Sequence, residues 1–186
     1  MDQFKELYSA DMHRYNGSAD SFLKRFHRYL RKSQCCKNLL MNYYYRFLFD
    51  RIKKKRGIEM SFRSKIGKGF YMGHAFNITI NMGAEIGENC NIHKGVTIGQ
   101  ENRGPRKGAP KIGNCVWIGV NAAIVGKITI GDDVLIAANS YVNCDVPSHS
   151  VVYGNPCIIK SKENATENYV NHKGTLRPTE RFFNTS

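Results

Sequence analysis

Histidine side chains carry the clearest acid–base chemistry in this sequence. An imidazole has a pKa of about 6.5, so near neutral pH it can take a proton from an attacking hydroxyl or amine. His74 and His93 both fall within the repeat region described below, and Asn77 follows shortly after His74. These residues predict a general base at His74, with His93 and Asn77 as candidate assisting groups.

Other common chemistries lack the residues that they need. The sequence has no G-x-x-x-x-G-K-[ST] nucleotide loop, no strand–G-x-G-x-x-G–helix unit and no G-x-S-x-G nucleophile motif. Its 6 cysteines form no C-x-x-C pair. The sequence therefore predicts no metal site.

A six-residue repeat must position the histidines. Such a period fits neither a helix nor a simple hairpin, and it indicates a parallel β-helix in which each hexad adds one short strand. One step has eight residues, from Met72 to Ile80, and contains His74. The repeated aliphatic positions are Ile66, Met72, Ile80, Ile86, Ile92, Ile98, Ile112, Ile118, Ile124, Ile130, Ile136 and Val142.

The repeat also defines the expected domain organisation. It occupies a domain at 58–160, and it is interrupted at 100–111 by a segment rich in glycine, proline and cations. Loops that leave a regular scaffold often carry function, so 100–111 is predicted to be a functional excursion. Residues 161–186 are polar and lack a period, which predicts an extended or partly disordered tail.

The N-terminal segment 1–57 is predicted to be α-helical and basic. Apolar residues recur at spacings of three and four within 2–15, after Ser18 and within 38–55. Between Lys24 and Arg56 the chain has twelve cationic residues and one acid, out of a net charge of +13. A solvated helical face and a peripheral membrane contact through 24–56 both remain open. Nucleic acid is not predicted as a partner, since no binding motif accompanies the charge.

The sequence also predicts a cytoplasmic location, with the membrane contact as an addition to it. There is no apolar run of about 18 residues, and the N-terminus lacks the basic-then-apolar layout of a signal peptide.

Beyond its period, the chain resembles the hexapeptide-repeat acyltransferases of the serine acetyltransferase-like branch, particularly the short members that acetylate capsule or other polysaccharides. The resemblance implies a left-handed parallel β-helix, a homotrimer with active sites between neighbouring subunits, and acetyl-CoA as donor. The matching residues are Ile66-Gly67-Lys68-Gly69, Met72-Gly73-His74-Ala75, Ile92-His93-Lys94-Gly95-Val96-Thr97-Ile98-Gly99, Pro110-Lys111-Ile112-Gly113, Trp117-Ile118-Gly119, Gly131-Asp132-Asp133, Ala137-Ala138-Asn139-Ser140 and Gly154-Asn155-Pro156.

The resemblance also assigns roles to single residues. The catalytic histidine of the family falls on His74, which would remove the proton from the acceptor hydroxyl. The pantetheine arm of acetyl-CoA would contact the coil near Gly99, Val120 and Ala138, and Lys160 would meet the phosphates of CoA.

The acceptor is harder to assign, because four polar residues of the family differ here. The aspartate before the histidine is Gly73, a later glutamate is Met82, and an Arg-His pair is Gly108-Ala109. Without these polar groups a bound serine zwitterion would be left unpaired. The expected acceptor is therefore a saccharide hydroxyl of a surface polysaccharide. Serine O-acetylation is the alternative, and a non-catalytic β-helix scaffold is the competing class.

Overall fold

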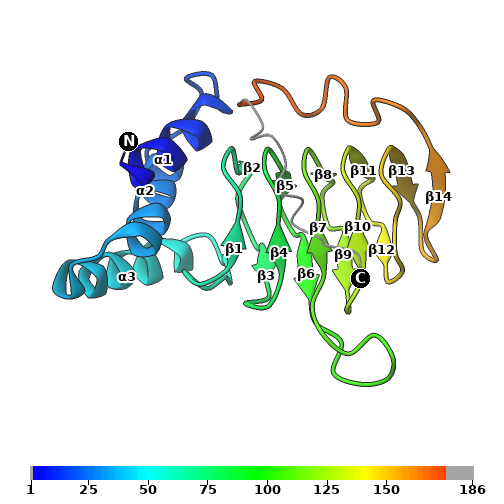
Figure 1. Cartoon of the computed structure of the whole chain (residues 1–186), viewed down its shortest axis with the longest axis horizontal. Helices are drawn as coiled ribbons and strands as arrows, with labels where there is room; N and C mark the ends of the chain where they lie inside the picture. The colour runs from blue at the N-terminus through cyan, green and yellow to red at the C-terminus, as the bar shows by residue number, and fades with distance from the viewer. Residues whose placement is uncertain (1, 175–186) are drawn as a thin grey trace.

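The computed structural model describes residues 2–174, which form a helical end and a long coil of short strands (Figure 1). Helices α1 (Gln3–His13), α2 (Ser21–Cys35) and α3 (Leu39–Lys54) gather at the N-terminal end of the coil. Every strand of this part of the chain comes after them, so the helical segment precedes the repeat region as the sequence predicts.

Each helix begins at a capping side chain. Asp2 accepts a hydrogen bond from Phe4 N, Asp20 accepts one from Leu23 N at 2.7 Å, and Asn38 accepts one from Met41 N at 3.0 Å. These bonds satisfy backbone N–H groups that have no partner within the helix. The side chains therefore fix where the helices begin.

A buried ion pair joins the helices to the coil. The Asp11 carboxylate of α1 accepts hydrogen bonds from Arg31 Nε at 2.8 Å and from Phe70 N at 2.9 Å. Arg31 also donates to the carbonyl oxygens of Ile66 and Gly67 in the first coil. The helical end is thus held against the first coil by charge-assisted hydrogen bonds.

The basic segment is less uniform on the surface than its sequence suggests. Arg31 is fully buried, Arg56 pairs with Asp20 at 2.6 Å, and Lys53 pairs with Asp50 at 2.7 Å. The membrane contact stays a prediction, but fewer unpaired cations are available on the surface for it than the sequence suggests. No helix within residues 2–174 is long and apolar enough to cross a bilayer.

The strands form three sheets, and from β1 to β12 successive strands along the chain enter successive sheets. The first sheet holds β1 (Lys65–Ile66), β4 (Glu85–Ile86), β7 (Lys111–Ile112) and β10 (Thr129–Ile130). The second holds β2 (Tyr71–Gly73), β5 (Asn91–His93), β8 (Trp117–Ile118), β11 (Val134–Ile136), β13 (Ser150–Tyr153) and β14 (Ile158–Ser161). The third holds β3 (Thr79–Ile80), β6 (Thr97–Gly99), β9 (Ala123–Val125) and β12 (Tyr141–Val142). All strand pairs are parallel except β13 with β14, so the chain winds as the predicted parallel β-helix.

The register explains the six-residue period. Ile66 lies opposite Ile86, which lies opposite Ile112, so the repeated aliphatic side chains stack along the inside of the coil. Ile92, Ile118 and their equivalents are fully buried, and each buried aliphatic side chain contributes about 1.5–3 kcal/mol to stability. The prediction that the repeated aliphatic residues form the core is therefore confirmed.

Two segments depart from the coil. Residues 100–110 leave it between β6 and β7 as a projecting loop, closed by paired hydrogen bonds of 2.9 Å between Glu101 and Gly108 (Figure 1). After β14 the chain returns along the coil, and Thr166 and Val170 are buried against it. The part of the predicted tail up to 174 is therefore bound to the coil instead of extending from it, and 175–186 lie outside the described residues.

Candidate active site

His93 has a defined tautomer. It lies at the end of β5, and its Nδ1 is 2.9 Å from the carbonyl oxygen of Ile118. Because a carbonyl oxygen can only accept, the proton is on Nδ1 and the lone pair is on Nε2. The ring is half-buried, and this desolvation lowers the pKa of His93, so the imidazole is neutral near pH 7.

Gly73 makes room for this ring. The register places Gly73 of β2 opposite His93, and a Cβ on residue 73 would lie 2.5 Å from His93 Nε2. Real Cβ atoms do not approach other atoms so closely. The imidazole of His93 therefore occupies the space where a side chain at position 73 would stand, including the aspartate expected from the family resemblance.

His74 follows directly, in the corner between β2 and β3. Its backbone has a φ of 51°, in the left-handed region, and its side chain is exposed. The charge of His74 contributes to lowering the pKa of His93, after burial. The structure thus brings together the two histidines that the sequence singled out.

A cavity of about 440 Å³ opens beside His74 and carries charges of both signs. Asp20 and Arg56 line it as an ion pair of 2.6 Å, and Lys94 adds an exposed cation. Burial raises the pKa of Asp20, but hydrogen bonds from Leu23 N and Arg56 outweigh this effect and lower it. The cavity therefore holds an ionised carboxylate next to two cations.

These charged residues were not predicted from the sequence. Arg56 lies between the rings of Phe22 and Phe76, at 3.9 and 4.9 Å from their centroids, which fixes its guanidinium at the cavity. Asp20 caps α2 in the structure. Asp20 reaches His74 from the start of α2 and Arg56 from the segment after α3, and no local motif predicts that the two meet.

Asn77 has a place in a repeated corner arrangement. Its side-chain oxygen lies 2.5 Å from where a Cβ on Gly57 would be, and Asn89 and Asn121 lie in the same way against Gly69 and Gly95. All three asparagines have positive φ. Asn77 therefore helps to form a corner of the coil. Its assisting role in catalysis stays a prediction.

The residues predicted to contact acetyl-CoA are divided by the fold. Val120 and Ala138 lie in successive corners on the same edge as His74, joined by a hydrogen bond of 2.9 Å from Asn139 N to Val120 O. Gly99 ends β6 in the third sheet, and Lys160 lies in β14 at the far end of the coil. Of the residues predicted to contact acetyl-CoA, only Val120 and Ala138 therefore lie on the same edge of the coil as His74.

Comparison with known proteins supports a hexapeptide-repeat transferase. Residues 109–144 match the family model for the bacterial transferase hexapeptide (six repeats). A serine acetyltransferase of Helicobacter pylori is 39% identical over 98 residues, which make up 53% of this chain and 57% of that protein. Serine acetyltransferase 2 of Arabidopsis thaliana is 39% identical over 109 residues, 59% of this chain and 34% of that protein. This chain thus spans 57% or less of the lengths of these two relatives.

Solved structures point the same way. The serine acetyltransferase of Neisseria gonorrhoeae in complex with serine aligns with a TM-score of 0.66 and 28% identity, over 86% of this chain and 69% of that one. The enzyme of Brucella abortus gives a TM-score of 0.72 and 25% identity, over 88% and 71% of the two chains. The shared architecture therefore extends beyond the hexapeptide repeats alone.

The expected saccharide acceptor is contradicted by these comparisons. The relatives and the solved structures are serine acetyltransferases, and they do not support the capsule or polysaccharide branch. The argument from lost polar groups also left out Asp20, Arg56 and Lys94, three charged residues that line the cavity beside His74.

Proposed function

We propose that this hexapeptide-repeat protein is an acetyl-CoA-dependent O-acetyltransferase of the serine acetyltransferase type, with His74 as its general base. The observation that carries the proposal is His74, which lines a cavity that holds both an acid and two cations and lies near enough to His93 to lower the pKa of that ring. In this proposal the coil is left-handed, and the enzyme is a homotrimer, as the resemblance implies.

His74 would move the proton. Its exposed imidazole takes the proton from the acceptor hydroxyl as that oxygen attacks the acetyl group, and then delivers the proton to the departing sulfur. His93 would orient His74, because its Nε2 lone pair is free to accept a hydrogen bond from an N–H of the His74 ring. The resemblance places an aspartate at position 73, which is glycine in this chain.

The charges around the cavity fit an amino-acid acceptor. Asp20 would accept hydrogen bonds from an ammonium group, since a carboxylate can accept about four and not all are used. Arg56 and Lys94 would face the carboxylate. A hydroxyl between these two ends would lie near His74. Serine has this arrangement of groups.

Acetyl-CoA would supply the acetyl group as a thioester. The exposed corner at Ala138 and the half-buried Val120 fit an extended pantetheine arm, because a small side chain leaves the edge of the coil open. The roles of Gly99 and Lys160 toward CoA remain part of the proposal, with Lys160 limited to contacts at the far end of the coil.

The test is CoA release in the presence of matched acceptors. L-serine is compared with ethanolamine, which lacks the carboxylate, and with 3-hydroxypropionate, which lacks the ammonium group. We expect turnover of serine and at least about a tenfold lower kcat/KM for each truncated acceptor, since a charged hydrogen bond contributes about 1.5–3 kcal/mol. Equal turnover of all three would contradict recognition by Asp20 and Arg56.

A scaffold without activity is the competing outcome. It predicts no CoA release with any acceptor and no stabilisation by acetyl-CoA in a thermal-shift experiment. A ligand at about 100 times its Kd adds about 2.7 kcal/mol to stability, so binding would be readily seen.

A further inference from the structure

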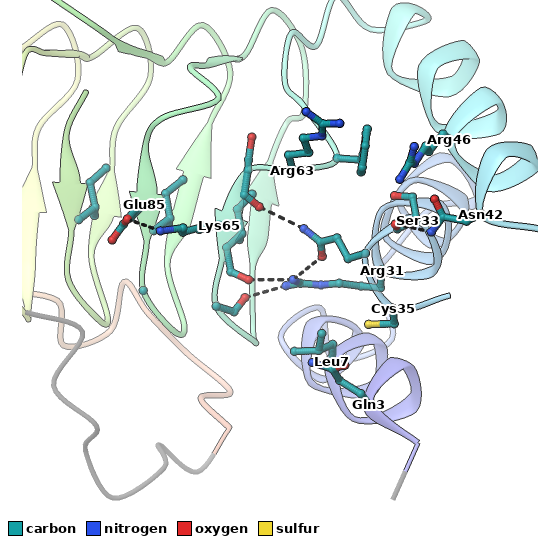
Figure 2. Close-up of a pocket in the computed structure, with 18 residues that line it drawn as sticks. Gln3, Leu7, Arg31, Ser33, Cys35, Asn42, Arg46, Arg63, Lys65 and Glu85 are labelled. Carbon is teal, nitrogen blue, oxygen red and sulfur yellow. Dashed lines mark hydrogen bonds and ion pairs between the residues drawn. The ribbon is translucent and has the colours of Figure 1, made fainter. Parts of the chain in front are cut away.

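A second cavity, of about 570 Å³, lies between the helices and the first sheet of the coil. Figure 2 shows it between the coil, which carries Lys65 and Glu85, and the helices, which carry Leu7, Asn42 and Arg46. Neither His74 nor His93 lines it. Its volume is in the range of about 300–1,000 Å³ that is typical of small-molecule sites.

Buried polar atoms without partners face this cavity. Asn42 Oδ1, Arg46 Nε and Ser64 Oγ have no hydrogen-bond partner within residues 2–174, and all three residues line the cavity. Asn42 is 8% exposed and Ser64 is 2% exposed, so bulk water does not readily satisfy them. Leaving such groups unpaired costs about 1–3 kcal/mol each, so a ligand that pairs with them would gain binding free energy.

The charges of the cavity are unbalanced toward the positive. Arg31 is neutralised by Asp11, and Lys65 is neutralised by Glu85 at 2.7 Å. Arg46 and Arg63 have no acidic partner in the described part of the chain. Arg46 instead lies over the ring of Phe62, 4.0 Å from its centroid.

The rest of the lining is largely apolar. Leu7 lines it from α1, Cys35 from the end of α2, and Phe62 from the segment before β1. Asn42 and Arg46 are one turn apart on α3, so their unpaired acceptor and donor lie on the same face of that helix. One end of the cavity therefore suits a polar head, and its body suits hydrocarbon.

We propose that this cavity binds a small amphipathic carboxylate that also carries a hydrogen-bond donor. The carboxylate would accept from Arg46 Nε and approach Arg63, the donor would reach Asn42 Oδ1, and the apolar body would lie against Phe62. The site is separate from the proposed acetyl-transfer site, so the two proposals can fail independently.

The test is isothermal titration of the full chain with 2-hydroxydecanoate. Two matched probes each lack one group: decanoate has no hydroxyl donor, and 1,2-decanediol has no carboxylate. We expect 2-hydroxydecanoate to bind, with affinity at least about tenfold lower for each truncated probe, as the loss of one such hydrogen bond implies.

Variants distinguish this cavity from nonspecific binding. Arg46→Gln should lower the affinity for 2-hydroxydecanoate at least about tenfold, whereas Arg51→Gln, an exposed cation on the same helix outside the lining, should not change it. Cys35→Phe should block binding by filling the cavity. No binding of the wild type, or equal binding by the Arg46 and Arg51 variants, would overturn the proposal.

Discussion

His93 Nε2 lies 2.5 Å from the point at which a side chain on Gly73 would begin. The parallel register makes these two residues neighbours across β2 and β5, and the hydrogen bond from His93 Nδ1 to Ile118 O holds the ring in place. The glycine and the histidine therefore depend on each other: Gly73 leaves the space, and His93 places a nitrogen lone pair in it, next to His74.

Replacing Gly73 tests this relationship. Gly73→Ala should push the His93 ring away from Ile118 O and lower kcat/KM by about 10- to 100-fold, as a displacement of about 1 Å near the reacting groups can do. The added effect of Gly73→Ala should be small in a His93→Ala background, because the ring that it displaces is absent. Gly83→Ala, where the nearest atoms are 3.3 and 3.4 Å away, is the control and should retain activity. Additive losses in the double variant would refute the coupling.

His74→Asn tests the proposed base with the fold preserved. Asparagine tolerates the positive φ of residue 74, and the side chain is exposed, so the melting temperature should change little. The rate of CoA release should fall by about 10²- to 10⁴-fold. His149→Asn is the matched control, since His149 is also an exposed histidine at a corner with positive φ. Full activity of the His74 variant would remove it from the mechanism.

The sequence was sufficient to predict the coil, since the aliphatic hexads form its core and the eight-residue step places His74 outside the regular wall. The sequence was not sufficient to predict which acceptor the protein uses. Gly73 was interpreted as a lost polar group, because sequence alone does not show that the ring of His93 fills the same space one coil later. Asp20 and Arg56 could not be assigned either, because they reach His74 from two different places in the fold: Asp20 from the start of α2, and Arg56, whose carbonyl oxygen accepts from Asn77 N at 2.8 Å, from the segment after α3.

The lowered pKa of His93 predicts a pH dependence of stability. In the unfolded chain this histidine has an ordinary pKa of about 6.5, and in the folded chain burial lowers it. The unfolded state therefore binds more protons below about pH 6.5, and the free energy of unfolding should decrease as the pH falls through that value. His93→Asn should show a weaker decrease in urea titrations at pH 7.5 and 5.5.

His149 acts in the opposite direction and must be separated from this effect. Its hydrogen bond to Asp133, at 2.9 Å, raises its pKa, so its contribution is present below about pH 6.5 and is lost as the pH rises through the folded value. The difference between wild type and His93→Asn cancels this contribution. An unchanged pH dependence in that variant would show that His93 does not titrate as a buried group.

Replacement of Asp11 should destabilise the fold more than the other substitutions proposed above. Its fully buried carboxylate pairs with Arg31 and accepts from Phe70 N, so Asp11→Asn leaves the buried guanidinium without its counter-charge. We expect a loss of about 3–5 kcal/mol in the free energy of unfolding, measured by urea denaturation. Asp50→Asn, which breaks a partly exposed pair with Lys53, is the control and should cost less than about 1 kcal/mol. Equal losses in the two variants would show that Asp11 does not hold the helices to the coil.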